Sequence, residues 1–77
     1  MKLHDAKKRH KVLITSIKNA DLRIKLLKIG LHEGAIADVL EKTANGPMLL
    51  EYKSQEIALG YEHATLIEVD LLNEKLP

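Results

Sequence analysis

The chain of 77 residues contains no cysteine, tryptophan or phenylalanine, and Tyr52 and Tyr61 are its only large aromatic side chains. Without cysteine, neither disulfides nor thiolate metal ligands can support so small a core, and a reducing cytoplasm is the expected location. Proline-rich peptides and single-stranded nucleic acids are bound largely on aromatic side chains. The scarcity of those side chains therefore argues against both classes of ligand.

Long apolar runs and catalytic motifs are also missing. No segment approaches the ~18 apolar residues of a transmembrane helix, and residues 12–17 are too few for the apolar region of a signal peptide. No nucleophile with a base, paired carboxylates or cofactor loop has motif-level spacing, and residues 30–34 lack the Lys and Ser/Thr of a phosphate-binding loop. We therefore expect a soluble protein that is not an enzyme, with no catalytic residue and no cofactor.

Basic and acidic residues nearly balance, at 12 and 11, but positive charge is concentrated at the N-terminus. The basic residues among the first eleven positions are Lys2, Lys7, Lys8, Arg9 and Lys11. Such a cluster suits phosphates or an anionic membrane surface, although charge runs are most often simply solvated.

Four histidines, His4, His10, His32 and His63, are spread along the chain. No two of them have the i, i+4 spacing that places two ligands on one helix face, and no cysteine joins them. The sequence therefore predicts no dedicated metal site. The pair His32-Glu33 leaves one option open, a transition metal trapped at an oligomer contact.

Runs of β-branched and alternating apolar residues predict a mainly β fold. The expected strands are residues 11–17, 35–42, 48–52, 56–59 and 66–69. Five strands with hairpin-length links, and a short α-helix between the first two, indicate a small Src-homology-3-like β-barrel. Residues 1–77 are expected to form one domain with its core at about 3–70 and a flexible tail at 71–77.

The most informative segment of the chain contains this helix, its end and a turn. Asp21 is expected to cap the start of the helix with its carboxylate. Leu22, Leu26 and Ile29 fall on one face at i, i+4 and i+7, with Leu27 beside them. A helix of about two turns is marginal alone, so this face must pack on the rest of the domain.

Gly30 is expected to end the helix, because glycine enters the left-handed conformation without a Cβ penalty. Leu31 then falls where a Schellman motif contacts Leu26. Gly34 lies in the turn before the second strand. We therefore regard Leu22, Leu26, Gly30 and Gly34 as critical for the fold.

An ordered set of short patterns runs through residues 3–70. The patterns are Leu22-Arg23, Leu26-Leu27, Gly30-Leu31, Gly34 before a strand, Gly46-Pro47, Ile57-Ala58-Leu59, Ala64 and Ile67-Glu68-Val69. Together they resemble the ferrous iron transport protein A (FeoA) family. The chain departs from that family at three places: Lys8-Arg9-His10 replaces a Pro-Gly-type turn, Ser54 replaces a glycine, and Gly60 replaces a basic residue.

The resemblance implies a barrel of this kind and a cytosolic accessory role in ferrous iron transport. It also implies a partner, the membrane transporter FeoB with its cytoplasmic GTP-binding domain. A similar domain ends the iron-dependent repressors, so a metal-dependent regulatory module is an alternative. No recognition helix fits in residues 1–20, and nucleic-acid binding is therefore not expected. A structural homo-oligomer joined through exposed strand edges is a further alternative.

The helix and its exit loop form the candidate partner-docking surface. Its members are Arg23, Lys25, Lys28, Leu31 and His32. Leu31 is ambiguous, because the Schellman contact with Leu26 buries it, whereas docking needs it exposed as an apolar anchor. The structural role is the favoured interpretation.

Overall fold

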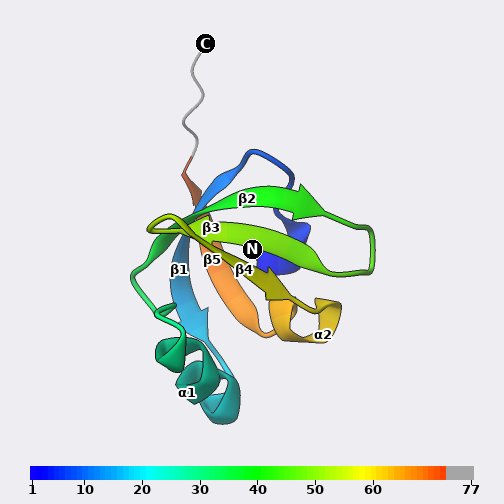
Figure 1. The fold of residues 1–77 in the computed structure, drawn as a ribbon. Coiled ribbons are helices and arrows are strands. Elements are labelled where there is room, and N and C mark those ends of the chain that lie inside the picture. Colours follow the sequence, from blue (N-terminus) through cyan, green and yellow to red (C-terminus); the bar gives the residue numbers. More distant parts are fainter. Residues whose placement is uncertain (73–77) are drawn as a thin grey trace.

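The computed structural model describes residues 1–72 and shows one curled, five-stranded antiparallel sheet with the order β4-β3-β2-β1-β5 (Figure 1). The strands are β1 (Lys11–Ile17), β2 (Ile36–Lys42), β3 (Met48–Tyr52), β4 (Gln55–Leu59) and β5 (Ile67–Leu72). The helical segments are η1 (Leu3–Asp5), α1 (Ala20–Lys28) and α2 (Tyr61–Ala64). The prediction of five strands, with a helix between the first two, is confirmed.

One face of the curled sheet forms the core, because each strand turns alternate side chains inward. In β1, Val12 and Ile14 are buried while Thr15 is exposed. A register shift between Ile14 and Ser16 inserts an extra residue, so that Ile17 also faces inward. The largest fully buried side chains are Leu3, Val12, Ile14, Ile17, Leu31, Val39, Leu50, Ile67 and Val69.

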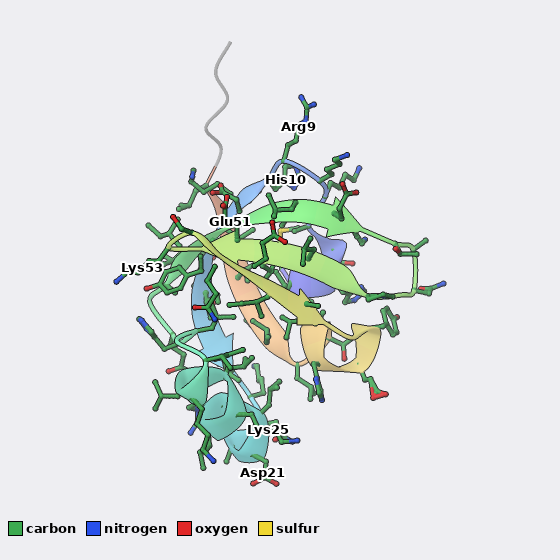
Figure 2. All side chains as sticks on the ribbon, in the orientation of Figure 1. Arg9, His10, Asp21, Lys25, Glu51 and Lys53 are labelled. Atoms are coloured by element: carbon green, nitrogen blue, oxygen red, sulfur yellow. The ribbon has the colours of Figure 1, made fainter. Side chains whose placement is uncertain are left out.

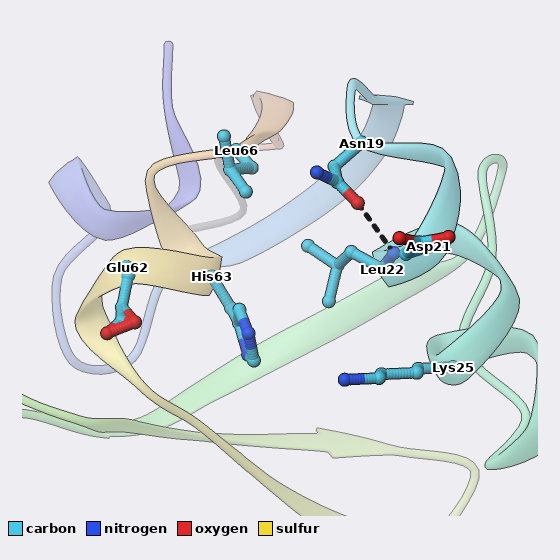
Figure 3. A pocket seen from close by; sticks show the side chains of 7 residues that line it. All are labelled: Asn19, Asp21, Leu22, Lys25, Glu62, His63 and Leu66. Atoms are coloured by element: carbon cyan, nitrogen blue, oxygen red, sulfur yellow. Dashed lines mark hydrogen bonds between the residues drawn. The ribbon is translucent and has the colours of Figure 1, made fainter.

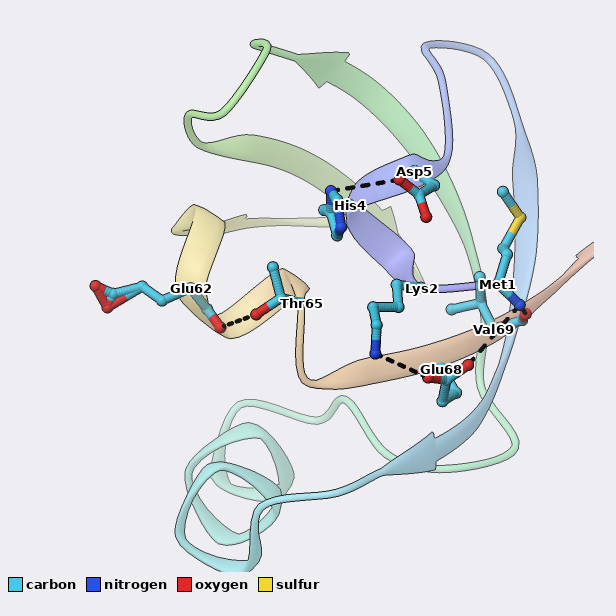
Figure 4. A network of polar contacts seen from close by, with 8 residues as sticks. All are labelled: Met1, Lys2, His4, Asp5, Glu62, Thr65, Glu68 and Val69. Atoms are coloured by element: carbon cyan, nitrogen blue, oxygen red, sulfur yellow. Dashed lines mark hydrogen bonds and ion pairs between the residues drawn. The ribbon is translucent and has the colours of Figure 1, made fainter.

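The sheet does not close into the barrel that the sequence suggests. Within residues 1–72 no ladder joins the end strands β4 and β5. The N-terminus covers the edge of β5 instead: the Met1 carbonyl accepts a hydrogen bond from the Val69 N–H at 2.8 Å, and Lys2 forms an isolated bridge with Glu68 (Figure 4). The next segment, η1, contacts both β5 and α2. The edge of β5 is therefore covered by the N-terminal segment, which also contacts α2, and it is not paired with β4.

Asn19, and not Asp21, caps the start of α1. The side-chain oxygen of Asn19 accepts a hydrogen bond from the Leu22 N–H at 2.9 Å. The helix consequently begins at Ala20, and Asp21 lies in its first turn, where a carboxylate is favoured by the helix dipole. The predicted cap was wrong because Asn and Asp are equally good N-caps and two candidates stand two residues apart.

The end of α1 follows the predicted Schellman motif. The Leu31 N–H donates to the Leu26 carbonyl at 2.9 Å, and the Gly30 N–H donates to the Leu27 carbonyl at 3.0 Å. Gly30 has a φ of 94°, the left-handed conformation that the motif requires. The helix stop was thus predictable from local sequence.

The predicted buried face of α1 is only half correct. Leu22 and Leu26 are buried, but Ile29 is 42% exposed and Leu27 is 60% exposed. Ile29 is the C-cap, with a φ of -101° and a ψ of 8°, so its side chain leaves the helical face. Leu27 lies about 100° around the helix from Leu26 and points away from the core.

Two turns at which the chain departs from the FeoA pattern keep a left-handed backbone without glycine. Arg9 has a φ of 77°, and Lys53 and Ser54 have φ values of 51° and 66°. Lys53 and Ser54 are the two loop residues between the paired residues Tyr52 and Gln55. Positive φ at both positions is the type I′ hairpin turn, which asparagine and glycine fit best.

The last strand is longer than its pattern suggests. Leu71 and Leu72 pair with Val12 and Lys11 in the ladder between β5 and β1. The tail predicted from Leu71 onward is therefore wrong at its first two residues, and residues 73–77 lie outside the described part of the chain.

Candidate functional site

Helix α1 carries most of the candidate docking residues and is anchored by two leucines. Leu22 and Leu26 are 4% and 3% exposed and belong to the core. The exposed basic residues of the helix are Arg23, Lys25 and Lys28. Because α1 lies at the end of β1, its outer face points away from the sheet (Figure 1).

Arg23 takes part in a polar network at the base of the helix. Its Nη2 donates to the Ile17 carbonyl at 3.3 Å, and its Nε lies 3.9 Å from Oε2 of Glu33. The same Glu33 oxygen accepts a hydrogen bond from the Ile17 N–H at 2.9 Å. Both polar backbone groups of Ile17 are thus bound by side chains from α1 and its exit loop.

His32 is joined to β3 through Tyr52. Its Nδ1 lies 2.8 Å from the Glu33 carbonyl, and because a carbonyl can only accept, Nδ1 carries a proton. Its Nε2 lies 3.3 Å from the Tyr52 hydroxyl, and the two rings meet edge to face with centroids 6.0 Å apart. Lys53 Nζ lies 5.5 Å from the Tyr52 ring centre. His32, Tyr52 and Lys53 therefore form a cluster around the Tyr52 ring, beside the exit loop of α1.

Leu31 does not belong to the docking surface. It is 0% exposed, and its N–H closes the Schellman motif on Leu26, so a partner has no access to it. The large apolar residues exposed within α1 are instead Ile24 and Leu27, at 55% and 60% exposure. Ile24 and Leu27 lie on the side of the helix opposite Leu22, and their i, i+3 spacing is the signal in the sequence that identifies them.

A pocket of about 190 Å³ lies between α1 and α2 (Figure 3). Its lining residues are Asn19, Asp21, Leu22, Lys25, Glu62, His63 and Leu66. Lys25 and His63 reach into it from the two helices (Figure 3). Acidic and basic side chains both line the pocket, so it favours neither an anion nor a cation.

The N-terminal basic cluster is partly neutralised by neighbouring carboxylates. The ion pairs are Lys2 with Glu68 at 3.4 Å, Lys8 with Glu41 at 3.3 Å and Lys11 with Asp38 at 2.9 Å. Arg9 lies at the end of the molecule opposite to Lys25 of α1 (Figure 2). The two basic regions of the chain therefore do not form one continuous surface.

The histidines lie in separate surroundings. The His4 ring meets the edge of the Tyr61 ring at 5.2 Å, and His10 Nδ1 accepts the Lys7 N–H at 2.9 Å. His63 lines the pocket, apart from the cluster that contains His32. Across residues 1–72, no three or more His, Asp or Glu side chains are grouped so as to hold a metal ion.

The fold is a small β domain made of a curled antiparallel sheet and a helix whose outer face is apolar and basic. Such a face is suited to contact with another molecule. No helix in the described part of the chain is both long enough and apolar enough to cross a membrane. The FeoA domain family matches residues 1–71, and the chain belongs to this family. Membership supports a role in ferrous iron transport.

Solved structures share this fold. An iron uptake regulatory protein (FeoA) is 27% identical, with 94% of this chain and 97% of that chain covered and a TM-score of 0.84. FeoA from Chlorobium tepidum is 24% identical, which supports a shared fold only. The match covers 99% of this chain and 74% of that chain, with a TM-score of 0.85. ScaR with bound Zn²⁺ is 27% identical with a TM-score of 0.82, and the match covers 94% of this chain but 37% of ScaR. No curated protein sequence matches the chain.

Proposed function

We propose that the chain is a non-enzymatic, cytoplasmic accessory of ferrous iron transport that acts by contact with FeoB, the membrane transporter with a GTP-binding domain. The match of the FeoA domain family to residues 1–71 is the observation that carries this proposal. The similar iron uptake regulatory protein (FeoA) points to the same process. FeoB is the partner that the family resemblance implies.

The surface chemistry of α1 supports a contact role. Ile24 and Leu27 are exposed on its outer face, and Lys28 and Arg23 flank them. An exposed apolar centre with a charged rim is a common arrangement at protein interfaces, where the rim shields the anchors from water.

Fe(II) uptake by intact cells tests this proposal. Cells that lack the gene are expected to accumulate Fe(II) more slowly than the parent strain, and a plasmid copy is expected to restore uptake. FeoB is quantified in both strains by immunoblot, so that loss of the transporter is not mistaken for loss of its accessory. Parental uptake in the deletion strain, together with no co-purification of FeoB with the tagged chain, contradicts the proposal.

A regulatory module is the second candidate, because ScaR with bound Zn²⁺ has the same fold over 94% of this chain. A module of this kind is expected to bind duplex DNA or to respond to Zn²⁺. A gel shift that persists at physiological salt favours this candidate, whereas weak binding that falls steeply with salt is nonspecific. Zn²⁺ titration monitored by calorimetry tests the metal response independently.

A homo-oligomer formed through strand edges has fewer available edges than the sequence suggests. Met1 and Lys2 occupy the outer edge of β5, which leaves β4 as the end strand open to pairing. Sedimentation velocity at increasing protein concentration distinguishes such an oligomer from a monomer.

A further inference from the structure

The outer face of α1 carries a narrow apolar line. Ile24 and Leu27 have the largest exposed fractions of the large apolar side chains among residues 1–72, at 55% and 60%. Ala20, one turn before Ile24, is also exposed. Steps of four and then three residues are those between the d, a and d positions of a coiled coil. We call Ala20, Ile24 and Leu27 the outer seam.

Folding does not account for the outer seam. Leu22 and Leu26 already fix α1 to the core from the opposite side of the helix. Polar residues in place of Ile24 and Leu27 would fit a surface helix equally well, and they would expose no apolar area to water. Apolar side chains at two exposed positions of this helix therefore indicate a surface that a partner covers.

The charges beside the outer seam define the partner further. Arg23 and Lys28 occupy the flanking g and e positions, which set partner choice in coiled coils. Lys25 adds another exposed positive charge, and Asp21 is the one carboxylate of α1. A partner with complementary charge consequently carries Asp or Glu beside its own apolar residues.

We infer that the outer seam docks an amphipathic helix of the partner protein, with apolar residues in its own seam and acidic residues on both flanks. This inference rests on the proposed function, because it describes the chemistry of the segment with which the partner meets α1. It assigns the anchoring role to Ile24 and Leu27 and the orienting role to Lys28 and Arg23.

A second copy of this chain fits the outer seam less well than an acidic helix does, because it brings the same net positive charge. In a parallel pair of α1 helices, Arg23 meets Lys28 of the other copy, since g and e positions face one another across the pair. In an antiparallel pair, Arg23 meets its own counterpart, although Asp21 of each copy attracts Lys28 of the other. The three cations of α1 outnumber its one carboxylate, so net charge disfavours self-pairing and favours an acidic helix.

The length of α1 limits the strength of this contact. Its nine residues (Ala20–Lys28) span about 13 Å at ~1.5 Å per residue. A contact over two turns buries much less than the ~800 Å² per partner of a stable interface. The outer seam is consequently an anchor within a transient or larger contact, and we expect the isolated helix-on-helix contact to be weak.

Two designed peptides test the inference without reference to any particular transporter. Both are amphipathic helices with leucine in the seam, one with glutamate at the flanking positions and the other with lysine there. Each is titrated into the ¹⁵N-labelled full chain and followed by chemical-shift mapping. The glutamate peptide is expected to perturb residues 20–28 and to bind about tenfold more tightly than the lysine peptide.

The double variant Ile24→Gln/Leu27→Gln is expected to lose the response to the glutamate peptide, while the control Leu71→Gln, an exposed apolar residue on β5, retains it. Equal binding of both peptides, no binding, shifts centred elsewhere, or a dimer that the double variant abolishes overturns the inference. Parental Fe(II) uptake in the deletion strain, together with no co-purification of FeoB by the wild-type chain and with the peptide response intact, instead overturns the proposed function.

Discussion

The Glu33 carboxylate accepts a hydrogen bond from the Ile17 N–H at 2.9 Å and thereby ties the loop after α1 to the last residue of β1. Arg23 completes this tie by donating to the Ile17 carbonyl at 3.3 Å. The entry and the exit of the helix therefore meet at one residue. The direction of α1, and of the surface that it presents, depends on this polar contact as well as on the core leucines.

Replacing Glu33 is expected to destabilise the fold. Glu33→Ala removes the acceptor of the Ile17 N–H at a partly buried site, and we expect a loss of about 1–2 kcal/mol in the free energy of unfolding. Urea denaturation monitored by circular dichroism measures this loss. Glu62→Ala is the matched control, because Glu62 is an exposed carboxylate in the first turn of α2. Equal effects of the two substitutions contradict the structural role of Glu33.

Leu26 and Leu27 are neighbours in sequence with opposite surroundings, at 3% and 60% exposure. Leu26→Ala is expected to cost about 2–4 kcal/mol, since it leaves a cavity where α1 meets the core. Leu27→Ala is expected to change stability by less than about 0.5 kcal/mol, because it removes no buried contact. Thermal unfolding of both variants compares them directly, and a Leu27 effect as large as that of Leu26 refutes the assigned orientation of the helix.

The turn between β3 and β4 is strained at Ser54, which has a φ of 66°. Ser54→Gly is expected to stabilise the protein by about 1 kcal/mol, because glycine adopts this conformation without the steric cost of a Cβ. Ser16→Gly in β1 serves as the control and is expected to destabilise, since glycine weakens a strand interior. If both substitutions shift the unfolding midpoint in the same direction, the type I′ assignment is incorrect.

Two glycines provide a second comparison of backbone conformation. Gly34 has a φ of 94°, whereas Gly60 has a φ of -71° and is the N-cap of α2. Gly34→Ser is expected to cost about 1–2 kcal/mol, because a side chain is strained in the left-handed region. Gly60→Ser has no steric neighbour within 4 Å and supplies a capping oxygen, so its stability is expected to be unchanged or slightly higher. Chemical denaturation of the two variants measures the change in the free energy of unfolding that each substitution causes.

Lys28 is a cleaner probe of partner docking than Arg23. Lys28→Glu is expected to leave the unfolding midpoint within about 0.5 kcal/mol of wild type, as surface substitutions usually do, while co-purification of FeoB falls. Arg23→Glu is expected to lower both quantities, because Arg23 also binds the Ile17 carbonyl. Lys7→Glu, an exposed change of the same charge at the N-terminal end, is the control. Retention of FeoB by Lys28→Glu removes Lys28 from the docking surface.

The strands, and the stop of α1, were predictable because their signals are local. Alternating apolar residues mark a strand, and the Gly30-Leu31 pair marks a Schellman motif, since both depend on neighbours within a few positions. The choice between Asn19 and Asp21 as the cap was not predictable, because each is chemically suited to the role. The burial of Leu31 followed from the same Schellman motif, and the structure agrees with that favoured interpretation, because Leu31 is 0% exposed.

Local sequence patterns are thus sufficient to predict the mainly β class, the order of elements, the helix stop and the resemblance to the FeoA family. The folded structure was needed to show that the sheet stays open between β4 and β5, that Met1 and Lys2 cover one edge, and that α1 turns Ile24 and Leu27 to solvent. These outcomes depend on contacts between residues far apart in the chain. Local patterns are not sufficient for them, because the same helix has two apolar sides and packing selects which one is buried.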